Sequence, residues 1–218
     1  MRGARRLDCV LLAIDTSAGT SVAVVDRARG IIVERSVADT MRHAEVIGRL
    51  IVDCLDASGV AIEVLGGVVA GMGPGPFTGL RVGIAAARAF AFGAAKPVLS
   101  VASHDAIAYQ RTVALKAAGR SLGAILVVTD ARRRELAWTA YDGVDGDGVP
   151  VRVEGPSLAP SSAIGREGFE RVDAQTVSAG ALGMLANDLW AAGRPFASED
   201  PLYLRSPDVT LSPPKRVT

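Results

Sequence analysis

Hydrophobic positions along the first sixty residues show two spacings, one typical of strands and one typical of helices. A continuous apolar run from Cys9 to Ile14 predicts a central strand, because strands buried on both faces need no polar positions. Two further strands, Ser21–Val25 and Gly30–Arg35, follow after tight turns, which predicts antiparallel hairpins. From Arg42 to Ser58 the apolar residues recur every three or four positions, as in an amphipathic helix that Gly59 would end.

The next stretch, Val68–Gly93, predicts a strand, a turn and a helix in direct succession. Val68–Ala70 ends a buried strand, and the glycines and prolines of Gly71–Pro76 continue neither a strand nor a helix. Thr78 is the expected N-cap of the helix. A short strand at Pro97–Val101 then completes a first half with the order βββαβαβ.

Small residues form a ridge along one face of this predicted helix. They lie four positions apart, at Gly79, Gly83, Ala87 and Ala91. Each glycine in a helix interior costs about 1 kcal/mol relative to alanine, so a close contact is expected to compensate. Two interpretations stay open: the ridge packs against this chain's own sheet or a neighbouring helix, or it docks a second protein.

The second half predicts a looser mixture of helices and strands. Helices are expected to begin at Ser103 and to run from Ser178 to Ala192. Strands are expected at Ala124–Val128, Glu135–Tyr141 and Val151–Glu154, with a hairpin loop at Asp142–Gly148. A boundary near Ala102 divides the chain into an N-terminal lobe, 1–102, and a smaller C-terminal α/β lobe, 103–218, which ends in an extended, Pro-rich tail.

Composition narrows the function classes. The chain has 218 residues, of which 49% are hydrophobic, and a net charge of +1, so its overall charge demands neither nucleic acid nor a membrane surface. Cys9 and Cys54 lie far apart in apolar runs and are interpreted as buried thiols in a reducing compartment. Charged residues interrupt every apolar run, and the basic N-terminus precedes no cleavage pattern, so the expected location is the cytoplasm, with no membrane contact.

Six motifs together resemble the TsaB (YeaZ) family. They are IDTSAGTSVAVVD (Ile14–Asp26), RHAEVI (Arg42–Ile47), GPGPFTGLRVGIAAARAFA (Gly73–Ala91), SVASHDAIA (Ser100–Ala108), DARRRELAW (Asp130–Trp138) and PLYLR (Pro201–Arg205). The Gly73–Ala91 block is the most specific of the six. The resemblance extends from about Val10 to Arg205.

This resemblance implies a fold and a role. The fold is the two-lobed actin-like (ASKHA) α/β fold, with mixed sheets flanked by helices. The role is that of a non-catalytic subunit in synthesis of N6-threonylcarbamoyladenosine (t6A) at position 37 of tRNA. The implied partners are the metal-bearing TsaD subunit and the ATPase TsaE, with tRNA reached indirectly through the complex. The resemblance also implies homodimers of the isolated chain, and ATP or ADP at the partner interface is a candidate cofactor.

The resemblance places the partner interface on the helices Arg42–Ser58 and Thr78–Gly93. The candidate interface residues are Val46, Leu50, Gly79, Leu80, Arg81, Gly83, Ala87 and Phe90. We expect Gly83→Leu to break the complex and to leave the chain folded.

Asp15, Thr16 and Ser17 form the candidate nucleotide loop, because active members of the superfamily place this turn at the nucleotide phosphates. The alternative is that Asp15 and Ser17 stabilise the turn through hydrogen bonds from backbone groups. The glycine-rich Gly71–Gly79 segment lacks the Gly-Lys-Ser/Thr of a P-loop, although the helix N-terminus that follows it could attract an anion.

No catalytic or metal-binding residue is expected. The catalytic relative binds metal with two histidines one helical turn apart, whereas here His43 is followed four positions later by Ile47, so capping or packing is the preferred role of His43. A stand-alone kinase or ATPase remains the alternative function, and a peptidase is the least favoured. The Arg132–Arg134 run is interpreted as a solvated turn, with contact to the tRNA backbone as the alternative.

Overall fold

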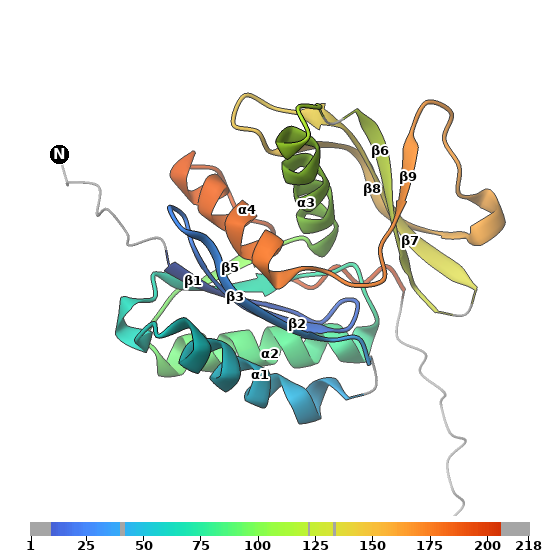
Figure 1. The fold of residues 1–218 in the computed structure, drawn as a ribbon. Coiled ribbons are helices and arrows are strands. Elements are labelled where there is room, and N and C mark those ends of the chain that lie inside the picture. The colour runs from blue at the N-terminus through green and yellow to red at the C-terminus, as the bar shows by residue number, and fades with distance from the viewer. Residues whose placement is uncertain (1–9, 40–41, 122, 133, 206–218) are drawn as a thin grey trace, which may run out of the picture.

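A computed structural model describes residues 10–39, 42–121, 123–132 and 134–205 (Figure 1). The first of its two sheets has the strand order β3-β2-β1-β4-β5. β1 pairs antiparallel with β2, and β2 with β3, whereas β4 runs parallel to β1 and β5 parallel to β4. The bounds are β1 (Val10–Asp15), β2 (Thr20–Asp26), β3 (Gly30–Val37), β4 (Gly67–Gly71) and β5 (Val98–Val101).

The predicted hairpins and the βββαβαβ order are therefore confirmed. Cys9, the expected first residue of the first strand, lies outside the described residues, as do the N-terminal extension and the tail beyond Arg205. β1, which is buried at every position, lies at the centre of the sheet, as its continuous apolar run requires.

Helices cover both faces of this first sheet. α1 (His43–Ser58) and α2 (Phe77–Gly93) lie side by side on one face, and α4 (Ala179–Ala191) packs on the other (Figure 1). α3 (Ser103–Ala117) lies between α4 and the second sheet. Gly59 ends α1 in the left-handed conformation, with a φ of 65°, as its sequence position predicts.

The start of α2 corrects one expectation. The cap residue is Pro76, with a φ of −59°, and no side chain caps the helix; Thr78 already lies inside the first turn. The fixed φ of proline suits a helix start, so the chain turns into the helix two residues earlier than the threonine suggested.

The second sheet has the strand order β8-β7-β6-β9. β7 pairs antiparallel with β8 across the predicted hairpin loop; β7 also pairs antiparallel with β6, and β9 runs parallel to β6. β7 extends to Val144, which shortens the predicted hairpin loop of Asp142–Gly148. The bounds are β6 (Ala124–Asp130), β7 (Glu135–Val144), β8 (Pro150–Pro160) and β9 (Glu170–Asp173), with short 3₁₀ helices at η1 (Ile62–Val64) and η2 (Ser161–Ala163).

Two hydrophobic cores flank the first sheet. One lies beneath α1 and α2, and the other fills the space between this sheet, α3, α4 and the second sheet. Among the described residues, no helix is both long enough and apolar enough to cross a membrane.

Candidate docking face and the turn that supports it

The turn after β1 is packed into α2. Thr16 is 1% exposed, and its hydroxyl donates a hydrogen bond to the carbonyl oxygen of Gly79, with an Oγ1–O distance of 2.7 Å. A Cβ added at Gly83 would overlap Thr16 Oγ1, and one added at Gly79 would lie 2.8 Å from the Thr16 carbonyl oxygen. The two glycines therefore let this turn reach the helix backbone.

The small-residue ridge thus faces this chain and not a second protein. Gly79, Gly83, Ala87 and Ala91 are all buried on the inner side of α2. Of the two interpretations of the ridge, the structure supports packing within the chain. The expectation that Gly83→Leu leaves the chain folded is corrected as well, because a leucine there would collide with Thr16.

Asp15 is the centre of a buried hydrogen-bond network. Its Oδ1 accepts from the backbone nitrogen of Ser17 at 2.8 Å and from the Ser17 hydroxyl at 2.6 Å, and its Oδ2 accepts from the Ser103 hydroxyl at 2.5 Å. Burial raises the pKa of the Asp15 carboxyl. The hydroxyl of Ser103 also accepts from Gly73 N at 3.0 Å, so the network joins β1, the loop before α2 and the start of α3.

Asp15 and Ser17 thus make the turn-stabilising hydrogen bonds that the sequence left open for this loop, whereas the Thr16 hydroxyl bonds to α2. Both carboxylate oxygens of Asp15 are engaged by donors of this chain, and the hydroxyl of Thr16 is bonded to α2. These side chains therefore do not fit the task of holding a metal or phosphate, and no step through a nucleotide follows from them.

His43 packs as its sequence position predicts. It is buried at the first position of α1, its Nδ1 lies 2.8 Å from the Thr20 hydroxyl, and its ring lies against Gly79. Burial lowers the pKa of His43, so the neutral ring is favoured. No group of three His, Cys, Asp or Glu side chains within the described ranges is arranged to hold a metal ion.

A second buried histidine tethers α3 to the second sheet. The ring nitrogens of His104 lie 2.7 Å from the Thr139 hydroxyl and 2.9 Å from the Thr129 hydroxyl. Burial lowers the pKa of His104 to about 3, which keeps the ring neutral between these two hydroxyls. The sequence contains the residue but gives no sign of these partners.

The predicted interface residues divide into a buried set and an outer set. Leu50, Gly79, Leu80, Gly83 and Ala87 are buried beneath the helices, and Val46 and Phe90 are half-buried against the same core. Arg81 is exposed on the outer surface of α2. The buried residues can therefore shape the outer surface, but they are not part of it.

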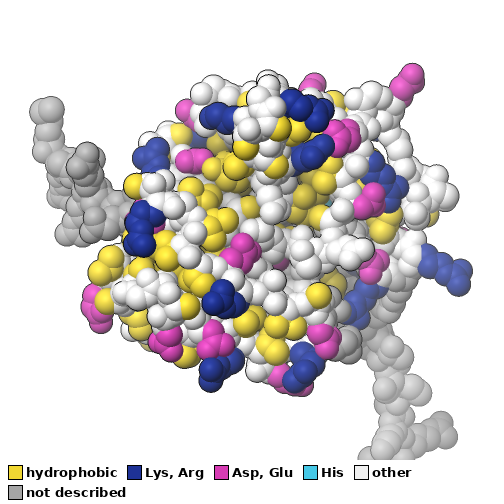
Figure 2. Space-filling view, in the orientation of Figure 1, with side chains coloured by type: hydrophobic (Ala, Val, Ile, Leu, Met, Phe, Trp, Pro, Cys, Tyr) yellow, Lys and Arg dark blue, Asp and Glu magenta, His cyan; other side chains and the backbone are white. Residues whose placement is uncertain are grey.

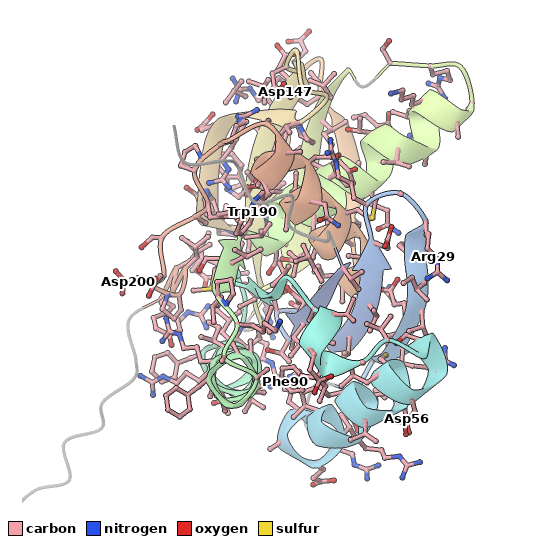
Figure 3. The ribbon with its side chains drawn as sticks, turned by 90° about the vertical axis from the view of Figure 1, so that its left-hand side faces the viewer. Arg29, Asp56, Phe90, Asp147, Trp190 and Asp200 are labelled. Atoms are coloured by element: carbon pink, nitrogen blue, oxygen red, sulfur yellow. The ribbon has the colours of Figure 1, made fainter. Side chains whose placement is uncertain are left out.

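The outer surface of α2 carries one residue that the sequence analysis missed. Phe92 is 90% exposed, near the end of the helix (Figure 3 shows the neighbouring Phe90). The exposed positions follow helical spacing from Arg81, through Ala85, Arg88 and Ala89, to Phe92. This spacing is visible in the sequence, but the sequence analysis placed the interface on the glycine ridge, which lies on the opposite side of the helix.

A cavity of about 430 Å³ opens beside the β1–β2 turn. Ser17 and Ala18 in the β1–β2 turn and Pro76 before α2 line it together with Asp130, Arg132 and Asp173 at the ends of β6 and β9, so its charged groups have both signs. Arg132 and Arg134 are exposed in the β6–β7 turn with φ values of 64°, whereas Arg133 lies outside the described residues.

Comparison with protein families gives a match over residues 23–148 to the model described as TsaD, tRNA N6-adenosine threonylcarbamoyltransferase. Curated proteins similar to the chain include TsaB of Escherichia coli, a tRNA threonylcarbamoyladenosine biosynthesis protein, at 28% identity over 171 residues, 78% of this chain and 67% of that protein. Among solved structures, YeaZ from Pseudomonas aeruginosa superposes with a TM-score of 0.72 and 25% identity, covering 89% of this chain and 99% of that one. The chain belongs to the TsaB family.

This TsaB-family chain also matches an uncharacterized protein of Mycobacterium tuberculosis, with 37% identity over 207 residues, 91% of the chain and 92% of that protein. The predicted two-lobed actin-like (ASKHA) fold, with two mixed sheets flanked by helices, is confirmed by the likeness to YeaZ over 89% of this chain.

Proposed function

We propose that this chain takes part in tRNA threonylcarbamoyladenosine biosynthesis as a non-catalytic subunit that docks the TsaD subunit through the outer surface of α1 and α2. The relatives named for this pathway support the process, and the exposed Phe92 supports the docking surface. An aromatic side chain left 90% exposed on a helix is a characteristic anchor of protein–protein interfaces.

The residues around Phe92 suit a helix-to-helix contact. Ala85 and Ala89 are exposed on the same side of α2, and short side chains let another helix approach closely. On the adjacent α1, Val52 adds a second apolar side chain that is 50% exposed. Docking is therefore proposed on this outer surface, and the buried glycine ridge acts by fixing the position of α2 on the sheet.

The alternative of a stand-alone kinase or ATPase requires Asp15 to hold a metal ion. In the structure Asp15 is 1% exposed and its oxygens accept hydrogen bonds from Ser17 and Ser103. This arrangement favours the subunit role. The same proposal has three further parts. TsaE associates with the pair, and this chain contacts tRNA only through the complex. Two isolated chains pair through the same outer surface.

The test is binding of purified TsaD to the wild-type chain and to two variants. Phe92→Asp places a charge in the proposed interface and is expected to abolish measurable binding. Val113→Asp is the matched control, because Val113 is an apolar residue 50% exposed on a different helix, α3; this variant is expected to bind as the wild type does. If Phe92→Asp also binds TsaD as the wild type does, the outer surface of α2 is not the docking site.

A reconstituted assay tests the division of roles. Transfer of labelled threonylcarbamoyl to tRNA is measured with this chain alone, with TsaD alone and with both, each supplemented with TsaE, ATP and the enzyme that forms threonylcarbamoyl-adenylate. Activity is expected only in the mixture, and Phe92→Asp should lower it. Activity of this chain without TsaD would contradict a non-catalytic role.

A further inference from the structure

Residues 196–205 form a strap that returns from α4 to the first lobe and runs beside α2. Ala197 N donates to the carbonyl oxygen of Ser100 at 2.9 Å, and Leu202 N donates to that of Met72 at 2.8 Å. Arg88 on α2 donates to the carbonyl oxygen of Glu199 at 2.7 Å. Figure 3 looks along α2 and shows the strap residue Asp200 beyond this helix, on the side away from α1. The strap thus borders the proposed docking surface.

The strap and α2 share a cluster of one arginine and two aromatic rings. The Phe77 and Tyr203 rings lie 4.7 Å apart, and the Arg81 Cζ lies 3.6 Å from the centre of the Phe77 ring. Arg81 Nε donates to the Tyr203 hydroxyl at 3.1 Å. These contacts fix the plane of an exposed guanidinium, while its two terminal nitrogens make no hydrogen bond with the described part of the chain.

The two arginines of α2 have hydrogen-bond partners in this chain but no carboxylate partner within its described part. Arg81 and Arg88 are the charged residues of this helix, it contains no acidic residue, and neither arginine pairs with a carboxylate among the described residues. α1 differs, because Arg42 pairs with Glu45 and Arg49 with Asp53, and Figure 2 shows charges of both signs over this helix. The charge on α2 is therefore positive and has no carboxylate partner within the described residues, whereas α1 also carries the exposed carboxylate of Asp56.

We propose that Arg81, held flat by Phe77 and Tyr203, binds a carboxylate side chain of the docked protein, so that the docking surface is built from α2 and the strap together. A planar guanidinium with both terminal nitrogens available matches a carboxylate in a two-point contact. The inference rests on the proposed docking of TsaD and adds the chemistry of one contact and the strap that positions it.

A protein carboxylate suits this site better than a nucleic-acid phosphate. Nucleic-acid surfaces gather many lysines and arginines, because affinity comes from several phosphates at once. Here Arg81 stands among alanines and aromatic rings, and the next cation on the helix, Arg88, lies seven residues away. Contact of Arg81 with tRNA is the outcome that the experiment has to separate from protein docking.

The experiment measures the Kd of full-length variants for purified TsaD by calorimetry, at two salt concentrations. Arg81→Gln removes the charge and is expected to raise the Kd about tenfold, as for loss of one charge-assisted contact. Arg81→Lys keeps the charge but loses the planar guanidinium. Tyr203→Phe keeps the ring but removes the hydroxyl that accepts the hydrogen bond from Arg81. Each of these two variants should raise the Kd about threefold. Arg120→Gln removes an equal charge from an exposed site beyond α3 and should leave the Kd unchanged.

The positioning role of Tyr203 is separated from a purely structural one by a double-variant cycle. If Tyr203 acts through Arg81, Tyr203→Phe adds nothing to the Kd of Arg81→Gln, and both variants weaken the salt dependence of binding. If the effects of Arg81→Gln and Tyr203→Phe on the Kd are additive, Tyr203 only holds the strap in place and does not position Arg81.

Two other results are decisive. If Phe92→Asp abolishes binding while Arg81→Gln binds TsaD normally, or if Arg81→Gln weakens tRNA binding alone, the carboxylate site is wrong and the docking surface survives. If the wild-type chain does not bind TsaD, both proposals fail together.

Discussion

Replacing Gly83 by alanine should destabilise the protein, although alanine is the better helix former. A Cβ at position 83 would overlap Thr16 Oγ1 and would lie 2.9 Å from Thr16 Cγ2 and 3.0 Å from Thr16 Cβ. Thr16 is buried and bonded to Gly79, so it cannot turn away without losing that hydrogen bond. Overpacking costs about 1–3 kcal/mol and the lost bond about 1 kcal/mol, against a gain of about 1 kcal/mol from helix propensity. The expected loss in free energy of unfolding is about 1–3 kcal/mol.

Gly48 provides the matched control. It lies inside α1, it is exposed, and nothing lies within 4 Å of a Cβ built on it. Gly48→Ala should therefore stabilise the protein by about 1 kcal/mol, so the same substitution has opposite signs in two adjacent helices. Urea unfolding followed by circular dichroism measures both changes from the midpoints at constant m-value.

A second test uses the contact partner. In a Thr16→Ala background the overlap with Oγ1 and Cγ2 is removed, and Gly83→Ala should then cost at least 1 kcal/mol less than it does alone. If Gly83→Ala stabilises the protein as Gly48→Ala does, the turn after β1 does not hold α2 as described.

Two further predictions concern the buried His104 and the half-buried Ser178. His104 has a pKa of about 3 in the folded protein against 6.5 when unfolded, so the unfolded chain alone takes up a proton between these values and stability falls as the pH drops below about 6.5. From pH 7 to pH 5, the free energy of unfolding of the wild type should fall by about 2 kcal/mol more than that of His104→Gln, as measured by urea unfolding at both pH values. Equal falls in the two proteins would mean that His104 does not titrate as described. Ser178 Oγ accepts from Ala181 N and donates to Glu34 at 3.0 Å each, so Ser178→Ala should cost about 1–2 kcal/mol in the same assay, and an unchanged midpoint would contradict this cap.

The regular elements of the fold could be predicted because apolar spacing records burial. The apolar run before Asp15 predicted a buried strand, and the three-to-four spacing of α1 predicted an amphipathic helix; both predictions were confirmed. β9 was missed because Glu170–Asp173 is short and carries three charged residues; it is a strand only because β6 lies beside it.

The candidate site was harder to predict, because a helix pattern shows which residues share a face but not what that face meets. α2 consists of apolar or small residues except for Arg81 and Arg88, so the ridge of Gly79 and Gly83 looked as suitable for a partner as for the core. What decides between them is Thr16, more than sixty residues earlier in the chain. The strap is a similar case, since nothing in the sequence around Tyr203 shows that it rests on α2.

The bond between Arg81 and Tyr203 joins residues 122 positions apart, and this separation has a consequence for synthesis of the protein. At about 5–20 residues per second, roughly 6–24 seconds pass between the appearance of the arginine and that of the tyrosine. During this interval the nascent first lobe can fold around α2, but the guanidinium has no hydroxyl to hold it. A partner that binds Arg81 in its fixed orientation therefore finds the complete docking surface only after the strap has been translated. Assembly with this partner would be delayed until translation has passed Tyr203.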